Sequence, residues 1–180
     1  MRYRHMFLMT GLLAVLAFGA ASADTLQTVL LTSSQVDARQ DAGVASPYTI
    51  LAISIPPEVT AAKLTRAILE FRADVFVQPI DGWVNDTPVV EVYALSSDLT
   101  GSYDASKLVQ PSAMKRPVST GENRTVRIDI TEAVRYWLAN PSKNHGLVLG
   151  SFRGAREGSF VVKADATREG ALAAVSFILE

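Results

Sequence analysis

The residues best suited to bind a ligand surround Trp83, in the segment QPIDGWVNDTP (78–88). Asp81, Asn85 and Asp86 are turn formers, so we expect a loop that places the indole near the surface. An exposed indole can stack on the apolar face of a sugar, while nearby polar side chains accept its hydroxyl protons. The segment therefore predicts a carbohydrate contact. The alternatives are a tryptophan folded back onto the core, and a structural calcium ion held by the three polar side chains.

Tyr103 is a second candidate for ligand contact, because it is the one aromatic residue in the polar stretch 96–118. A connection of about 20 residues without secondary structure is uncommon in a compact domain. Such a stretch is usually functional, or it contains strands that the sequence pattern does not reveal.

Paired carboxylates raise the question of glycoside hydrolysis. Glu70 and Asp74 share one face of an expected strand, and Glu91 lies on the next expected strand. If those strands pair, two acids could face each other across a groove, as that reaction requires. The alternative is a solvated face on which Arg72 is a cross-strand partner of the acids.

His145 is a weak candidate for catalysis or metal binding. A catalytic triad holds its histidine by hydrogen bonds on both sides, and a zinc site needs several His or Cys ligands. The chain has 2 His and no Cys. We therefore interpret His145 as a residue of the KNHG turn, and we predict no catalytic residue and no cofactor. The sequence also contains no nucleophile elbow, P-loop or dinucleotide-binding motif.

The first 23 residues are expected to be a secretory signal peptide. Arg2 and Arg4 precede an apolar run from Met6 to about Ala20, and Ala21–Ala23 forms a small-residue cleavage pattern. The run is short for a membrane span of about 20 residues. We expect the leader to be removed, leaving no membrane anchor and a secreted or periplasmic protein of one domain, residues 24–180.

The composition limits how this domain is stabilised and what it binds. Without cysteine, an exported chain depends on its core because no disulfide can form. Removal of the leader lowers the 17 basic residues to 15, against 18 acidic ones, and a slightly acidic chain argues against nucleic acid as partner.

Short runs of β-branched and aromatic residues, separated by Gly, Pro, Asn and Asp, dominate the chain. Within 63–77, Leu69, Phe71 and Val75 alternate with charged residues, which is the period of a half-buried strand. The predicted fold is all-β, a jelly-roll-type β-sandwich of about eight strands. The predicted strands are 25–34, 46–55, 63–77, 88–95, 123–130, 146–152, 159–164 and 171–179.

One segment, about 130–140, has the period of a helix. Ile130, Val134, Trp137 and Leu138 recur at i, i+4, i+7 and i+8. Burial of Trp137 would hold this helix across one end of the sandwich, and a ligand platform is the alternative. The predicted core is Leu51, Ile53, Leu69, Phe71, Val90, Val92, Ile128, Val134, Trp137, Leu147, Leu149, Val175 and Phe177.

The ends of this helix have their own signals. Asp129 is the expected N-cap, and Glu132, three residues later, would complete a capping box. Asn140 precedes a proline, which disfavours further helix. Gly146 is expected to be structural, in the turn that leads into the next strand.

Several motifs along the chain form a pattern found in one known family. They are A-x-L (Ala67, Leu69), V-x-V-Y (Val90, Val92, Tyr93), I-D-I-T-x-x-V-x-x-W-L (128–138) and N-x-G-L-x-L (144–149). Together they resemble the DNRLRE domain, a β-sandwich module of exported bacterial and archaeal proteins. That domain is similar to the family 96 carbohydrate-binding modules and to disaggregatase-related repeats. The resemblance implies a sandwich fold, an exported location and a sugar ligand.

These observations predict an exported, non-catalytic module that binds a cell-envelope or extracellular polysaccharide. The first alternative is a structural or protein-interaction component of the cell surface or periplasm, with an envelope protein as partner. The second alternative is a glycan-cleaving enzyme.

Overall fold

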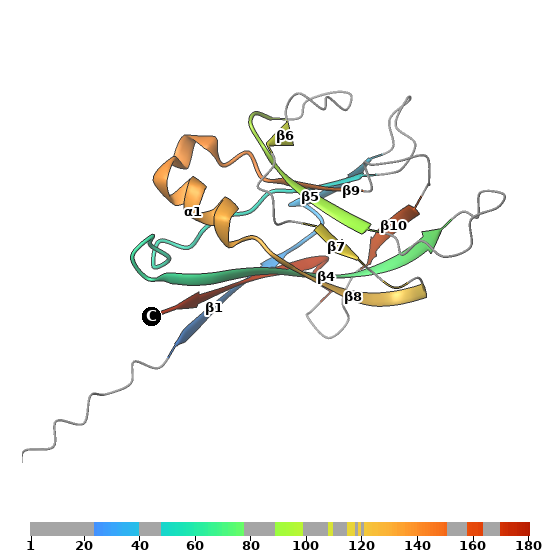
Figure 1. Cartoon of the computed structure of the whole chain (residues 1–180), viewed down its shortest axis with the longest axis horizontal. Coiled ribbons are helices and arrows are strands. Elements are labelled where there is room, and N and C mark those ends of the chain that lie inside the picture. Colours follow the sequence, from blue (N-terminus) through green and yellow to red (C-terminus); the bar gives the residue numbers. More distant parts are fainter. Residues whose placement is uncertain are drawn as a thin grey trace, which may run out of the picture.

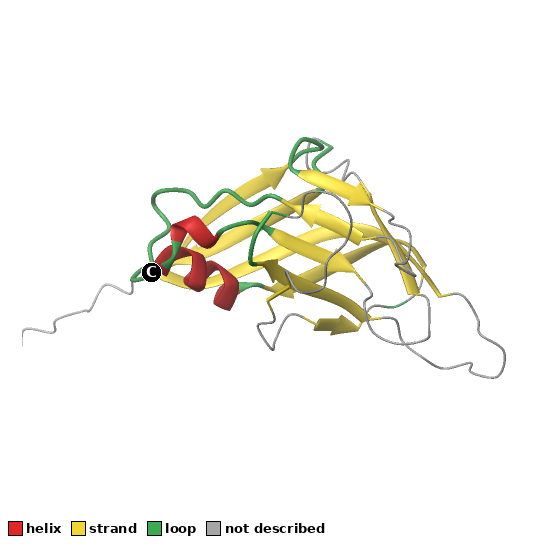
Figure 2. Ribbon diagram, turned by 90° about the horizontal axis from the view of Figure 1, so that it is seen from above, coloured by secondary structure: helices red, strands yellow, loops and turns green. Residues whose placement is uncertain are grey.

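The computed structural model describes residues 24–39, 48–77, 89–98, 108–109, 115–117, 119, 121–150, 158–163 and 170–180. The predicted leader lies outside these ranges. The described strands form two antiparallel sheets, with an α-helix at one end of them (Figures 1 and 2). Sheet A contains β1 (Thr25–Leu31), β4 (Leu64–Val77), β8 (Gly121–Asp129), β10 (Gly158–Lys163) and β11 (Ala173–Leu179). Sheet B contains β2 (Val36–Arg39), β3 (Tyr48–Leu51), β5 (Val89–Leu95), β6 (Leu108–Val109), β7 (Lys115–Pro117) and β9 (Leu147–Gly150).

Sheet A is built around the long strand β4. On one side of β4, β11 and β10 follow each other end to end, since Ala173 lies opposite Phe71 and Lys163 lies opposite Arg72. On the other side lies β8. β1 pairs with the far side of β11. β10 and β11 thus occupy a single strand position in the sheet, next to β4.

Sheet B has the order β2, β3, β9, β5, and both β6 and β7 pair with the remaining side of β5. If the end-to-end strands are merged, the central orders are β1–β10/β11–β4–β8 and β3–β9–β5–β6/β7. Strands from the two ends of the chain therefore neighbour each other in both sheets, which is the winding of a jelly roll. The predicted fold class is confirmed.

All of the predicted strands are present, although β3 ends at Leu51, before the predicted end of its run. The sequence analysis missed β2, β6 and β7. The last two lie within the polar stretch 96–118, and they have only 2 and 3 residues. Strands this short carry no readable alternation of polar and apolar residues, and their pairing with β5 comes from the tertiary fold.

The core lies between the inner faces of the two sheets and continues under the helix. Every residue predicted for the core is buried there. The helix α1 (Thr131–Ala139) supplies Val134 and Trp137, which are 0% and 1% exposed. Burial of this indole fixes the helix against one end of the sandwich (Figure 2), as predicted.

The start of α1 differs from the prediction. The N–H of Val134 donates to the carbonyl of Ile130 at 3.0 Å, so Ile130 is the N-cap residue. Asp129 lies one position earlier, with its backbone still in β8 opposite Ile68. Its carboxylate nevertheless accepts the N–H of Thr131 at 3.0 Å, and this satisfies one of the unpaired donors of the first turn.

The predicted capping box is wrong. Glu132 is exposed, and no hydrogen bond is found for it within the described part of the chain. The physical reason is that Asp129 remains a strand residue and Ile130 is the N-cap. The helix therefore begins one position too late for Asp129 and Glu132 to cap each other's backbone N–H groups. The predicted end of the helix is confirmed, because the N–H of Asn140 closes the last turn on Tyr136 and Pro141 begins a short 3₁₀ helix (Pro141–Lys143).

Candidate functional site

The side chains predicted to bind a ligand, or a calcium ion, lie outside the described residues, and both predictions stay open. These side chains are Asp81, Trp83, Asn85, Asp86 and Tyr103. The described strand ends show where the Trp83 segment is attached. Near its beginning, β4 contacts the start of α1, because the carbonyl of Ala67 accepts the N–H of Ile130. β4 ends at Val77, and β5 begins at Val89. β4 therefore ends, and β5 begins, at the end of the sandwich opposite α1.

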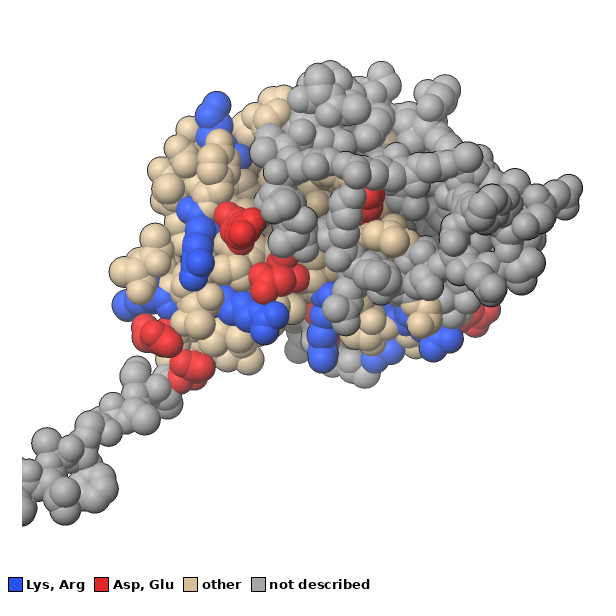
Figure 3. Space-filling model, viewed as in Figure 1, with Lys and Arg blue, Asp and Glu red and all other residues tan. Residues whose placement is uncertain are grey.

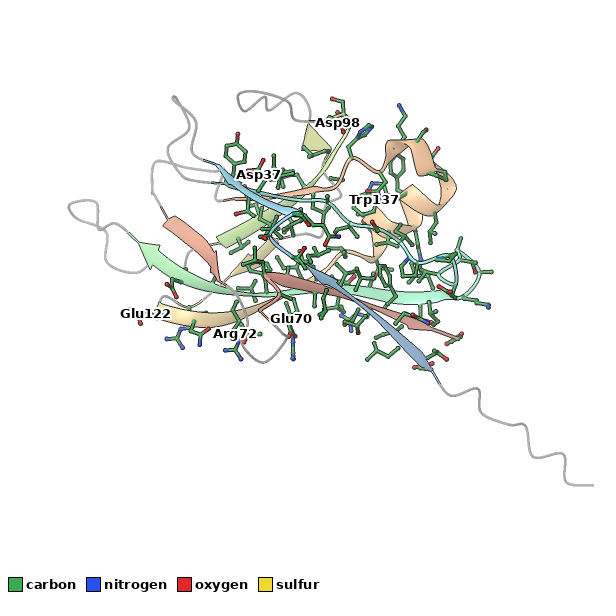
Figure 4. All side chains as sticks on the ribbon, turned by 180° about the vertical axis from the view of Figure 1, so that it is seen from behind. Asp37, Glu70, Arg72, Asp98, Glu122 and Trp137 are labelled. Carbon is green, nitrogen blue, oxygen red and sulfur yellow. The ribbon has the colours of Figure 1, made fainter. Side chains whose placement is uncertain are left out.

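The prediction that Glu70 and Glu91 face each other across a groove, as glycoside hydrolysis requires, is wrong. Glu70 lies on the outer face of sheet A, where it forms an ion pair with Arg127 of β8. Glu91 lies on the outer face of sheet B, and β4 and β5 belong to different sheets. Figure 4 shows Glu70 and Arg72 directed away from the sandwich. Because packed sheets are about 10 Å apart and the two acids point in opposite directions, they cannot act on one glycosidic bond.

Asp74 has a structural role. It is 9% exposed, and its Oδ1 accepts the backbone N–H of Asn123 at 2.8 Å. Asn123 has a φ of 53°, in the left-handed region that asparagine tolerates better than most residues. The carboxylate thus holds an irregular part of β8, where the pairing with β4 shifts between Ala73 and Val75.

The outer face of sheet A carries charges of both signs. Besides Glu70 and Arg127, Arg66 Nε lies 2.9 Å from Asp129 Oδ2. Figure 3 shows basic and acidic side chains interspersed over the described part of the visible surface. This mixture is typical of a solvated face, which was the alternative reading of the paired acids.

The outer face of sheet B is different, because it is buried and largely apolar. We name its residues Tyr48, Tyr93, Leu95 and Val148, with the neighbouring Glu91, the sheet B outer cluster. Tyr93 and Glu91 are two residues apart on β5 and therefore share a face. The hydroxyl of Tyr93 donates to Glu91 Oε2 at 3.0 Å, and the glutamate is 3% exposed.

Gly150 separates the acid of this cluster from Tyr48. It lies opposite Glu91 on β5. On its other side, the register that pairs Thr49 with Leu149 places Tyr48 beside it. Across β3, β9 and β5, the row thus contains the phenol of Tyr48, then Gly150 without a side chain, and then the carboxylate of Glu91.

His145 lies at the other end of sheet B, near α1. Its Nδ1 is 2.9 Å from Oδ1 of Asp98, a residue 47 positions away that the sequence analysis did not connect with it. Asn144 supports the same turn, since its amide donates to the Ile53 carbonyl at 2.8 Å. A carboxylate can orient an imidazole for proton transfer, but no hydroxyl bonds to His145 within the described residues. The described residues therefore supply no nucleophile for this pair, and His145 is interpreted as a residue of the turn.

Two further observations concern the described residues. No group of three or more His, Cys, Asp or Glu is placed to hold a metal ion in that part of the chain. No helix in the same ranges is both long and apolar enough to cross a bilayer.

The sequence matches no family model, and it matches none of the curated proteins compared with it. The resemblance to the DNRLRE domain therefore stays a hypothesis carried by the motifs themselves.

Proposed function

We propose that the chain is an exported, non-catalytic jelly-roll module that binds a cell-envelope or extracellular polysaccharide. The observation that carries the proposal is the buried Glu91–Tyr93 pair on the outer face of sheet B. A carboxylate on an outer sheet face can remain in water, whereas burying it costs several kcal/mol unless partners compensate. A few oriented polar groups among aromatic side chains are characteristic of small-molecule sites.

Within this proposal, direct sugar stacking belongs to Trp83 rather than to the tyrosines. Tyr48 and Tyr93 are only 1% and 5% exposed, so neither ring can stack on a sugar. Glu91 lies two residues after the start of β5, at the end of the sandwich to which the Trp83 segment is attached. The sheet B outer cluster is therefore proposed as the base that supports a binding loop, with Asp81, Asn85 and Asp86 as hydroxyl partners.

The proposed location rests on the sequence. The leader pattern of residues 1–23 and the lack of cysteine are compatible with a periplasmic or secreted chain. The resemblance to the DNRLRE domain supports the same compartment and the same class of ligand.

Affinity electrophoresis through gels that contain envelope or extracellular polysaccharides tests this proposal. The wild type is expected to be retarded by at least one polysaccharide, and Trp83→Ala is expected to lose the retardation without a change in melting temperature. Tyr136→Ala is the matched control, because Tyr136 is 48% exposed and lies on α1, at the other end of the sandwich. Absence of retardation in every gel, or equal loss in both variants, contradicts the proposal.

The function of the supporting cluster is tested separately. Tyr93→Phe removes the hydroxyl that donates to Glu91 and keeps the ring. If the cluster supports the binding loop, this variant should bind the polysaccharide several-fold more weakly than the wild type. Unchanged binding would remove the sheet B outer cluster from the site and with it the structural observation that carries the proposal, leaving Trp83 as a ligand contact supported by the sequence alone.

A protein-interaction role is a second candidate, favoured by one observation. Leu26 and Leu30 of β1 are 64% and 37% exposed, and both lie on the outer face of sheet A. Pull-down from an envelope extract, with and without Leu26→Lys, separates a protein partner from a polysaccharide ligand.

A further inference from the structure

β1 is an edge strand that has none of the usual protection against pairing. Within the described residues it pairs with β11 alone, and its sequence TLQTVLL contains no charge and no proline. Figure 1 shows the start of β1 at the lower left border of the molecule. Natural proteins usually block such edges with charged residues, proline or bulges, because an open edge pairs with other strands.

The opposite edge of the same sheet provides the contrast. β8, the edge strand next to β4, has the sequence GENRTVRID. Its exposed residues include Glu122, Arg124, Arg127 and Asp129. Charges of this kind oppose pairing with a second strand. Among the residues that the structure describes, one edge of sheet A is thus protected and the other is open.

The backbone direction shows which groups β1 presents at its open edge. The carbonyl of Leu31 accepts the N–H of Leu172 at 2.8 Å, on the β11 side. Successive carbonyls of a strand alternate in direction, so the carbonyls and N–H groups of Leu26, Thr28 and Leu30 point to the free edge. These residues are centred on Thr28, with one exposed leucine on each side.

We infer that β1 pairs antiparallel with β1 of a second copy of this chain, about a two-fold axis at Thr28. In this register, Thr28 lies opposite Thr28 of the second copy, and Leu26 lies opposite its Leu30. The free backbone groups of all three residues are then paired. A two-fold interface requires a self-complementary surface, and the leucines placed symmetrically about Thr28 provide one.

The side chains fit the same register. Leu26 lies beside Ile178 and Leu30 beside Ala174 on the outer face of sheet A. Between them, the Thr28 hydroxyl lies 3.3 Å from that of Ser176. Pairing would bring the leucines of the two copies into contact on either side of this polar centre. Because β1 has no charge, no like charges of the two strands meet across the axis. A strand from a different protein would not need this symmetry.

Sedimentation equilibrium of the exported protein without glycan tests the inference, and it does not depend on the proposed polysaccharide binding. The wild type is expected to dimerise, and Leu26→Lys and Leu30→Lys should each weaken dimerisation at least about tenfold, since each places a charge opposite a leucine of the second copy. Thr125→Lys on β8 is the control and should dimerise as the wild type does. A monomeric wild type, or a dimer that both lysine variants leave intact, overturns the inference.

A cysteine cross-link tests the register itself, because the natural chain has no cysteine. Directly opposite residues of antiparallel strands have Cα atoms about 5.5 Å apart, within the range of a disulfide. Thr28→Cys should therefore form a covalent dimer under mild oxidation, much faster than Thr125→Cys. Equal rates for the two variants overturn the register. A chain that is monomeric alone and cross-links through Thr28→Cys to another envelope polypeptide assigns the edge to a foreign strand, and this also overturns it.

Discussion

The hydroxyl oxygen of Thr131 accepts the backbone N–H of Ala67 at 2.9 Å, at the point where β8 ends and α1 begins. Ala67 also accepts the N–H of Ile130 through its carbonyl, at 2.9 Å. The pairing of β4 with β8 ends one residue before, at Ile68 and Asp129. A side chain thus replaces the strand partner that Ala67 loses when the chain turns into the helix.

Replacing Thr131 by valine tests the hydrogen bond between the Ala67 N–H and the Thr131 hydroxyl. Valine keeps the shape of threonine and leaves the Ala67 N–H buried without an acceptor, which costs about 1–3 kcal/mol of unfolding free energy. Thr131→Ser keeps the oxygen and should cost less than half of that loss. Chemical denaturation of the three proteins measures the difference, and equal stability of the valine and serine variants would contradict the assigned contact.

Asp129 should make the stability of the protein depend on pH. Partial burial raises the pKa of its carboxyl, but hydrogen bonds from the Thr131 side chain and backbone and from Arg66, with the Arg66 charge, outweigh this and hold the pKa below its ordinary 3.8. A lowered folded-state pKa stabilises the fold fully above the unfolded pKa, and this stabilisation is lost as pH falls through the lower folded value. The stability difference between wild type and Asp129→Asn should therefore be constant near neutral pH and shrink in acid. A difference that stays the same down to strongly acidic pH argues against this pairing.

Gly146 and Gly170 separate backbone strain from steric conflict. Their φ angles are 88° and 76°, a region that favours glycine. A Cβ at Gly146 would collide with the carbonyl oxygen of Leu51, whereas nothing lies within 4 Å of a Cβ at Gly170. We expect Gly170→Ala to cost about 1 kcal/mol and Gly146→Ala at least about 2–3 kcal/mol. Thermal unfolding of both variants measures this, and a similar loss in both would show that the Leu51 carbonyl moves aside.

Trp137 should dominate the stability of the helix contact. Its replacement by alanine is expected to cost about 3–5 kcal/mol, as for other buried large aromatic side chains. The indole Nε1 is buried and has no hydrogen-bond partner in the described part of the protein. Trp137→Phe removes this unpaired donor and leaves a small cavity, so it should cost only about 1–2 kcal/mol. An unchanged melting temperature for the alanine variant would show that Trp137 is not a core residue.

Much of the fold could be predicted from the sequence because the local period of apolar residues indicates which side chains are buried. Leu69 and Phe71 alternate with charged residues along β4, and Val134 and Trp137 recur along α1 at helical spacing. Two of the strands that escaped prediction, β6 and β7, have only 2 and 3 residues and are too short to show any period. β6 and β7 exist because β5 offers them an edge, and this is a tertiary property.

The contacts within the candidate sites depended on the strand order and not on local periodicity. Sequence spacing suggested that Glu70 and Glu91 face each other, but the winding of the jelly roll places consecutive strands β4 and β5 in different sheets. The same winding brings Asp98 to His145, and it sets Tyr48 and Glu91 in one row with Gly150 between them. Proximity between residues far apart in sequence depends on strand order and register, which no local pattern encodes.

The sequence alone therefore determined the all-β class, the strands long enough to alternate, the amphipathic helix and the residues of the core. Each of these depends on burying apolar side chains at a fixed local period. The tertiary structure decided the strand order, the position of Asp129 before the helix, the partners of each acid and the open edge at β1. These features depend on which backbone groups remain unpaired after the two sheets have formed, and that is settled only when distant segments meet.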